Sequence, residues 1–211
     1  MTLLTDDELA SPLQPKPKLI TYKQYLATAP EDEHSEWVNG EIIPMAPISD
    51  EHQDVGSFLL VLMKTYVAHK HLGFIRYEPF QMKTGPDLPG CSPDILFLAK
   101  SNARRMKKNH LQGPADVVVE IIGPGSQSRD RGEKFFEYEQ GGVREYWLID
   151  PHRKQAEFYL RDSKGIFQLS PIGKDGIFAS KVITGFRIKP AWLFQRPLPS
   201  EYSIIKQWKL G

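Results

Sequence analysis

The stretch DVVVEIIGPGSQSRDRGEKFFEYEQGGVREYWLIDP, residues 116–151, contains three structural elements in a row. DVVVEII (116–122) is a nearly continuous apolar run, typical of a central strand that is covered on both faces. A turn rich in Gly, Pro and Ser leads into RDRGEKFFEYEQ (129–140), a predicted helix that Gly141 and Gly142 end. EYWLID (145–150) then predicts another strand. We therefore expect a sheet with this helix packed against it through Phe135 or Phe136.

The residues before this stretch predict more strands and two helices. Asn39-Gly40 between two apolar-rich runs predicts a hairpin with strands at 35–38 and 41–45. Apolar residues then recur at helical spacing and predict a helix over 50–72, with Ser49 as its cap and Gly73 as its stop. Strands are expected over 74–83 and 94–99, and Thr21 is expected to cap a short helix over 22–29.

The residues after Pro151 predict strands over 155–160, 165–169 and 182–188, followed by a short helix in PAWLF (190–194). Residues 1–18 hold three prolines among polar residues and predict a flexible N-terminal arm, and residues 196–211 are expected to form a C-terminal tail. A chain of 211 residues is long enough for one domain, predicted over 19–195. The fold class expected is α/β (α+β), with a mixed sheet core flanked by helices, an N-terminal hairpin and C-terminal strands.

The composition excludes several classes of protein. Hydrophobic residues make up 40% of the chain and charged residues 25%, which is the balance of a soluble globular protein. A net charge of +1 excludes a strongly basic overall field, so any nucleic-acid binding must use a local basic surface. The lone Cys91 cannot form an intramolecular disulfide and is interpreted as a small residue beside a strand. No apolar run approaches the ~20 residues that span a bilayer, and the N-terminus has no secretory signal, so a cytoplasmic location is expected.

Three charged residues on consecutive elements indicate a metal site. Asp94 opens one predicted strand, Glu120 lies near the end of the next, and Lys134 lies in the helix that follows. Two carboxylates at adjoining strand ends suit Mg²⁺ (or Mn²⁺), which needs only one or two protein carboxylates beside its waters. Such an ion activates water and neutralises charge on a phosphoryl group, and a nearby ammonium can orient the water or stabilise the phosphate.

Each of these residues also has an ordinary structural interpretation. Asp94 follows Pro93 and suits a turn at a strand start. Asp130 and Glu133 have the spacing of an N-cap and a capping box, and Asp130 with Lys134 that of a solvated i, i+4 pair. Glu120 fits such an interpretation least, because an acid inside DVVVEII should be buried, and burying an unpartnered carboxylate is costly.

The chain resembles the Uma-type (Uma-two) family, which is classed with the restriction endonucleases in the PD-(D/E)XK nuclease superfamily. The resemblance runs from about Leu19 to Phe194 and rests on NGEI (39–42), PDILFL (93–98) and the stretch from Val117 to Pro151. It implies a restriction-endonuclease-like fold and a metal-dependent endonuclease that hydrolyses phosphodiester bonds of nucleic acid, with DNA as the expected substrate. The alternatives are a catalytically inactive nucleic-acid-binding or structural protein on the same fold, and a hydrolase of another phosphoester.

The resemblance also implies roles for individual residues. Asp94 and Glu120 correspond to the two acidic metal ligands, commonly joined by the backbone carbonyl of Ile121. Ile122 stands where the superfamily usually has its lysine, and Lys134 would be the displaced lysine. Gly123 stands where relatives usually have serine, which alters the turn rather than the chemistry.

Further residues match recurrent positions of that family. Glu41 is expected as a further catalytic ligand or base, or else as a surface strand acid. His52 is expected to contact phosphate or water, or else to be an ordinary residue of the first helical turn, and Asp130 is a further candidate for a phosphate or water contact. Tyr138 is a catalytic candidate or a packing residue, and the pair Tyr146-Trp147 is interpreted as core rather than as a base-stacking platform. A homodimer is expected by analogy. The dense basic cluster after the Asp94 strand is expected to hold backbone phosphates, or else to be a solvated loop; it comprises Arg104, Arg105, Lys107, Lys108 and His110.

These assignments make geometric predictions. The carboxylates of Asp94 and Glu120 should lie within about 6 Å of each other to share one ion, on strands that are neighbours in the sheet. The Lys134 ammonium should lie within about 4–6 Å of a Glu120 oxygen, and Lys134→Met should abolish cleavage while leaving folding largely intact, because the ammonium acts on transition-state charge.

Overall fold

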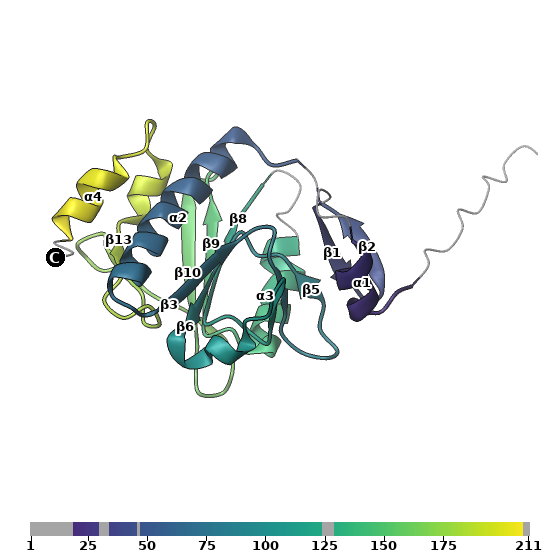
Figure 1. Ribbon diagram of the computed structural model, residues 1–211. Helices are drawn as coiled ribbons and strands as arrows, with labels where there is room; N and C mark the ends of the chain where they lie inside the picture. Colours follow the sequence, from purple (N-terminus) through teal and green to yellow (C-terminus); the bar gives the residue numbers. More distant parts are fainter. Residues whose placement is uncertain (1–18, 30–33, 46, 124–128, 209–211) are drawn as a thin grey trace, which may run out of the picture.

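A six-stranded mixed sheet forms the centre of the computed structural model, which describes residues 19–29, 34–45, 47–123 and 129–208 (Figure 1). β8 and β9 run parallel, and the other neighbouring strands of this sheet run antiparallel. The predicted mixed sheet flanked by helices is therefore confirmed. The strands, in spatial order, are β11 (Phe167–Leu169), β10 (Gln155–Arg161), β9 (Glu145–Asp150), β8 (Val117–Ile121), β6 (Ile95–Ala99) and β3 (Gly73–Tyr77).

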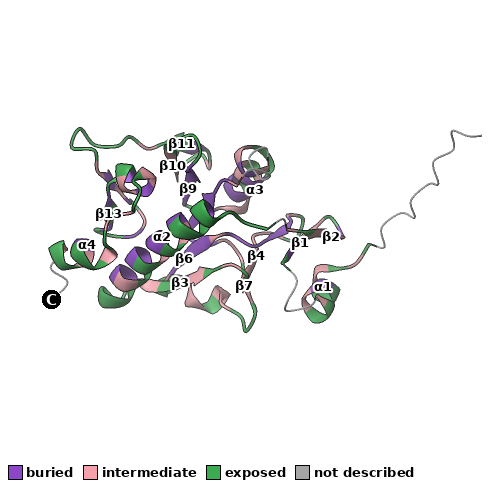
Figure 2. Cartoon of the chain, turned by 90° about the horizontal axis from the view of Figure 1, so that it is seen from above, coloured by how far each residue is buried: buried purple, intermediate pink, exposed green. Residues whose placement is uncertain are grey.

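Helices cover both faces of this sheet. Helix α2 (Asp50–His69) packs on one face and helix α3 (Lys134–Gly141) on the other, so the buried residues lie in the layers between them (Figure 2). Side chains alternate along β8, and Val117, Val119 and Ile121 belong to the α2 layer while Val118 belongs to the α3 layer. This explains why DVVVEII has almost no polar positions. Tyr146 and Trp147 in β9 are fully buried, which confirms their interpretation as core.

A smaller sheet lies beside the first and contains the predicted hairpin. Asn39 and Gly40 take positive φ angles of 51° and 96°, as the turn requires. The predicted strand over 74–83 is wrong as a single element, because Pro79 has no N–H for a ladder and the chain changes sheets there. The order of the smaller sheet is β2 (Glu41–Pro44), β1 (Ser35–Val38), β5 (Gly90–Cys91), β4 (Gln81–Lys83) and β7 (His110–Gln112), and helix α1 (Tyr22–Thr28) precedes it in the chain.

The predicted beginning of α2 is confirmed, and its predicted end is wrong. Ser49 caps the helix by accepting a hydrogen bond from the backbone N–H of His52. Gly73, however, does not stop it. The helix ends at His69, His71 takes the left-handed conformation with φ 53°, and Gly73 already belongs to β3. A Cβ at Gly73 would lie 2.1 Å from the carbonyl oxygen of Leu98, so this glycine permits close approach of two strands.

The C-terminal residues pack onto the α2 side of the protein. They form β12 (Phe178–Ala179), β13 (Arg187–Ile188), the 3-10 helix η4 (Pro190–Phe194) and helix α4 (Glu201–Gln207). The strand expected over 182–188 is thus confined to its last two residues. Part of the segment 196–211, expected as a tail, is α4, because Ser200 caps a helix whose Ile204 is buried in the core. The predicted arm 1–18 lies outside the described residues.

Replacing Ile204 tests whether α4 is part of the folded domain. Ile204→Ala should lower the free energy of unfolding by about 2–4 kcal/mol, because a buried side chain is lost from a packed core. Tyr202→Ala on the same helix is the control, since Tyr202 is 75% exposed, and it should change stability by less than about 0.5 kcal/mol. Urea denaturation measures both. Equal small effects would mean that α4 contributes nothing to the core.

Candidate functional site

A cavity of about 590 Å³ lies at the end of the large sheet where β8 ends and α2 begins. It brings together most of the residues that the sequence singles out, although they come from four separate parts of the chain. Hydrophobic residues of the β2 strand and the segment after it, including Ile43, Met45 and Ile48, form part of its wall. The predicted site residues that line it are His52, Asp94, Glu120, Ile121, Asp130 and Lys134.

Asp94 immediately precedes β6, and Glu120 lies in the neighbouring strand β8. Ile95 of β6 pairs with Val119 of β8 in an antiparallel register. Asp94, the residue before Ile95, therefore lies opposite Glu120, the residue after Val119. Asp94 Oδ2 accepts a hydrogen bond of 2.6 Å from the backbone N–H of Ile121, which ties its carboxylate to the end of β8. The predicted adjacency of the two strands is confirmed. The 6 Å separation of the carboxylates stays a prediction.

Lys134 points inward at the beginning of α3 and is only 3% exposed. Its Nζ lies 3.0 Å from Glu120 Oε1, 3.3 Å from Asp130 Oδ1 and 3.6 Å from Glu36 Oε1. The predicted closeness to Glu120 is confirmed. The interpretation of Asp130 and Lys134 as a solvated surface pair is wrong, because both side chains are buried. Asp130 is not an N-cap in front of the helix either; it lies within the helical turn η3 (Arg129–Glu133).

Tyr138 completes the surroundings of Glu120. Its hydroxyl donates a hydrogen bond of 2.5 Å to Glu120 Oε1, the same oxygen that Lys134 contacts. Tyr138 is fully buried, so it both packs beneath the sheet face and fixes the carboxylate. Phe135 attaches α3 to the sheet through edge contacts with Tyr146 and Tyr159, as expected, whereas Phe136 is 59% exposed.

Burial shapes the protonation of this site. Burial raises the pKa of the Glu120 carboxyl well above its ordinary value, the charges of Asp94 and Asp130 act in the same direction, and Lys134 opposes them. Burial likewise raises the pKa of Glu78, with Asp94 adding to it. His52 Nε2 lies 3.3 Å from Asp94 Oδ2, and although burial lowers the pKa of this imidazole, its bond to Asp94 raises it overall. Burial is the largest influence on all three pKa values, and the neighbouring acids raise each of them.

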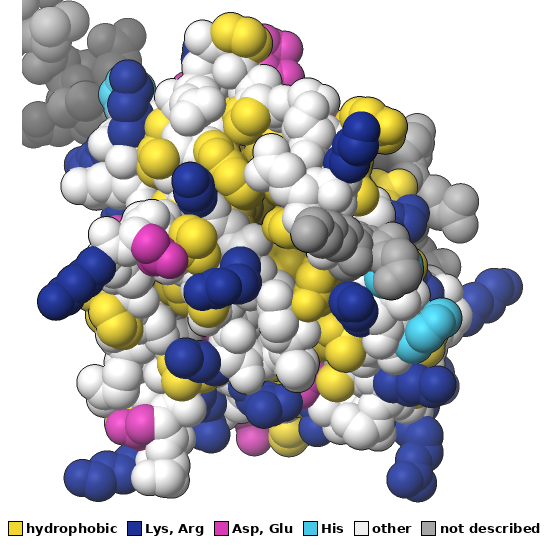
Figure 3. All heavy atoms as spheres, turned by 90° about the vertical axis from the view of Figure 1, so that its left-hand side faces the viewer, with side chains coloured by type: hydrophobic (Ala, Val, Ile, Leu, Met, Phe, Trp, Pro, Cys, Tyr) yellow, Lys and Arg dark blue, Asp and Glu magenta, His cyan; other side chains and the backbone are white. Residues whose placement is uncertain are grey.

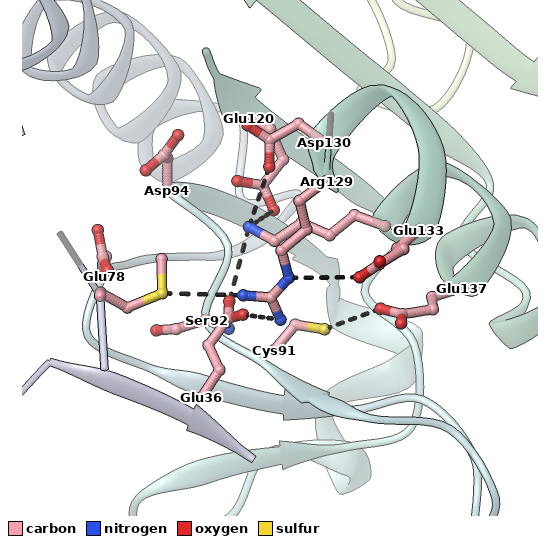
Figure 4. A network of polar contacts seen from close by, with 12 residues as sticks. Glu36, Glu78, Cys91, Ser92, Asp94, Glu120, Arg129, Asp130, Glu133 and Glu137 are labelled. Atoms are coloured by element: carbon pink, nitrogen blue, oxygen red, sulfur yellow. Dashed lines mark hydrogen bonds and ion pairs between the residues drawn. The ribbon is translucent and has the colours of Figure 1, made fainter. Parts of the chain in front are cut away.

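Three site residues are not found by the sequence argument: Glu36, Glu78 and Arg129. Glu36 is fully buried in β1, accepts a hydrogen bond from the Ser92 backbone, and pairs with Arg129, which leans between Glu36 and Glu133 (Figure 4). Glu78 lines the cavity next to Asp94. Glu36 carries the same signal as Glu120, since it is an acid within a predicted strand. Glu78 and Arg129 carry none, because only the tertiary fold brings them here.

Other expected residues lie elsewhere. Glu41 is partly exposed beside the hairpin turn and does not line the cavity. The basic cluster follows the opposite end of β6 from Asp94, in and after the 3-10 helix η2 (Lys100–Arg105), because the strand runs away from the site (Figure 1). Two of its members are engaged locally: Arg105 donates to the Pro114 carbonyl and Lys107 to the Arg104 carbonyl. This cluster therefore does not flank the cavity.

The site has the donors that a hard divalent ion needs. Within the described residues, no hydrogen bond or ion pair engages Asp94 Oδ1 or Glu120 Oε2, while the second oxygen of each carboxylate is held. Among the described residues, four carboxylates line the cavity, those of Glu78, Asp94, Glu120 and Asp130. Lys134 pairs with Glu120, Asp130 and the buried Glu36, Arg129 pairs with Glu36, and His52 contacts Asp94. No group of three or more His, Cys, Asp or Glu side chains in the described ranges has metal-binding geometry. Two carboxylates that leave the other positions to water are a donor set that Mg²⁺ can use.

Comparison with known proteins finds a family and a structure of similar fold. The model of the Uma2 family, described as "putative restriction endonuclease", matches residues 21–191. A crystal structure described as a putative nuclease belonging to DUF820, from Anabaena variabilis, superimposes with a TM-score of 0.66 and 18% identity, covering 83% of this chain and 97% of that chain. At this identity the likeness shows the fold alone. No curated protein matches the chain. No helix of the described residues has the length and apolar character to cross a membrane.

Removing the buried ammonium tests how the charge cluster supports the fold. Contrary to the expectation from sequence, Lys134→Met should not leave folding intact. It should lower the free energy of unfolding by about 3–5 kcal/mol at neutral pH, because it leaves buried carboxylates without their partner. Lys64→Met, at an exposed position of α2, should have little effect. Adding Glu120→Gln to Lys134→Met should recover part of the loss. If Lys134→Met and Lys64→Met had the same free energy of unfolding in urea denaturation, the buried-cluster account would be contradicted.

Proposed function

This chain belongs to the Uma2 family, and on that premise we propose that it is a divalent-metal-dependent endonuclease that hydrolyses phosphodiester bonds of DNA. One observation carries the proposal: Asp94 and Glu120 line the same cavity beside a buried lysine, and each has one carboxylate oxygen that no other described residue contacts. A carboxylate oxygen that has no protein donor can take an ion instead, and oxygen ligands are the ones that Mg²⁺ prefers.

Asp94 Oδ1 and Glu120 Oε2 would hold one Mg²⁺ or Mn²⁺, and the Ile121 carbonyl is the third candidate ligand. When bound, the ion neutralises charge on the phosphate and lowers the pKa of a coordinated water. The excess of carboxylates over cations supports this assignment, because a polyanionic substrate would otherwise be repelled from the cavity.

The remaining residues position and balance these groups. Lys134 and Tyr138 both bind Glu120 Oε1, so Oε2 would be the oxygen available to an ion. The Lys134 ammonium also places a positive charge beside the expected position of the phosphate. Arg129 lines the cavity and is one-fifth exposed, so its guanidinium can contact a phosphate oxygen while Glu36 holds its other side. His52 orients Asp94 through the contact of 3.3 Å.

The two alternative functions differ from this proposal in what they do to DNA. An inactive nucleic-acid-binding protein would retard plasmid DNA without cutting it, and a hydrolase of a small phosphoester would do neither. Ile122 makes the first alternative worth testing, since the usual strand lysine is absent; its side chain instead joins the apolar cluster beneath α3. A homodimer and a cytoplasmic location stay predictions.

Isosteric substitutions of the two acids test the proposed activity. The wild-type protein should nick supercoiled plasmid in Mg²⁺ or Mn²⁺ and stop on addition of EDTA. Asp94→Asn and Glu120→Gln should reduce nicking to background, because each removes a charged ligand without changing shape. Asp54→Asn is the matched control, since Asp54 is an exposed acid of α2 two residues from His52. Nicking that persists in EDTA, or in both acid variants, would refute the proposal.

A further inference from the structure

The proposed substrate is a polyanion, yet the catalytic cavity is acidic and the basic cluster after β6 lies at the other end of that strand. The chain as a whole has a net charge of only +1. A local surface must therefore supply the positive charge that holds nucleic acid. The C-terminal face has such a surface.

Two adjoining hollows form one groove on this face. One, of about 510 Å³, lies along β12 and the loop before it, and the other, of about 410 Å³, lies between the end of α2, β13, η4 and α4. They are continuous because Ile177 and Arg187 line both. Figure 3 shows this side of the protein, where Lys and Arg side chains border a furrow with hydrophobic side chains in its floor.

Most of the charged side chains that line this C-terminal groove are positive. Asp175 is the single acid that lines it within the described chain, and one of its oxygens accepts the Ile177 N–H. None of the groove's cations forms an ion pair with a described residue. The cations, all exposed, are Lys70, Lys174, Lys181, Arg187 and Lys189.

The floor of the groove is aromatic and apolar. Trp192 and Trp208 are both partly exposed in it, beside Ile188. Trp208 is held in place by edge contacts with Tyr66 at 5.5 Å and with Phe186 at 5.5 Å. Partly exposed indoles suit flat ligands, and exposed cations without an ion-pair partner among the described residues suit anionic ones. A ligand that has both properties is a nucleic-acid strand.

From this combination we infer that the C-terminal groove binds a single strand of nucleic acid, with its phosphates on the cationic rim and its bases on Trp192 and Trp208. A duplex would present its phosphates but not its base faces, so the aromatic floor favours a single strand. The inference goes beyond the proposed function, because it assigns a second binding site. That site is separate from the cavity: α2, with His52 near one end and Lys70 just past the other, has 20 residues and spans about 30 Å.

Binding of fluorescein-labelled oligo(dT) of 12 nucleotides, measured by fluorescence anisotropy in EDTA, tests the groove without catalysis. The wild-type protein should bind, and the affinity should fall with salt by about 0.7 logarithmic units per phosphate contact for each tenfold rise. Arg187→Glu with Lys189→Glu should weaken binding at least tenfold and lower the salt slope. The matched control, Lys23→Glu with Lys64→Glu, makes the same change of charge at exposed helical positions outside the groove and should stay within about twofold of wild type.

The stacking part of the inference has its own variant. Trp192→Ala should weaken oligo(dT) binding about tenfold, and Trp192→Phe should retain most of it, because a phenyl ring still stacks. If charge reversal destabilises the fold, Arg187→Gln with Lys189→Gln gives the same test with a smaller effect.

Equal affinities of the groove and control variants would overturn the inference, as would a wild-type protein that does not bind oligo(dT). If the groove variants lost affinity for a 12-base-pair duplex but kept their affinity for oligo(dT), the single-strand assignment would be refuted. These outcomes are distinct from failure of the proposed endonuclease, because Asp94→Asn should lose nicking while keeping its oligo(dT) affinity.

Discussion

The buried ammonium of Lys134 is the interaction on which the site and much of the fold depend. It lies within 3.6 Å of carboxylates from three elements, Glu120 of β8, Asp130 of η3 and Glu36 of β1. Because β8 belongs to the large sheet and β1 to the small one, the same charge joins both sheets to α3. A charge so deeply buried is tolerated only when its partners are in place, so the arrangement of these elements is strongly restricted.

The same cluster explains why the cavity suits a cation. Lys134 and Arg129 offset part of the acidic charge, and no contact among the described residues engages Asp94 Oδ1 or Glu120 Oε2. Packing apolar side chains around these groups would not remove the excess of negative charge. A bound divalent ion would neutralise it, and would also reduce the repulsion between the cavity and a phosphate group. Nucleic acid would still have to be held by positive charge elsewhere, which is the role inferred for the C-terminal groove.

Sequence predicts the parts of this protein that depend on local pattern. The central strands, the Asn39-Gly40 turn and the Ser49 cap follow from alternation and turn chemistry, and Glu120 is found because an acid does not fit an apolar strand. What fails depends on tertiary contacts. Gly73 resembles a helix stop, but strand packing requires it. The basic cluster follows Asp94 in sequence, but the strand carries it away. Glu78 and Arg129 reach the cavity only because the chain changes sheets after β3 and α3 folds back over β8.

The central claim is that Asp94 and Glu120 hold one divalent ion next to Lys134. The most direct measurement is anomalous diffraction from a crystal soaked in Mn²⁺. The account predicts a single strong peak between the two carboxylates, about 2.1 Å from Asp94 Oδ1 and Glu120 Oε2, with Lys134 still bound to Glu120 Oε1. The account would be contradicted if a crystal saturated with Mn²⁺ gave no anomalous peak at this position, or if the Mn²⁺ bound other acids of the cavity instead.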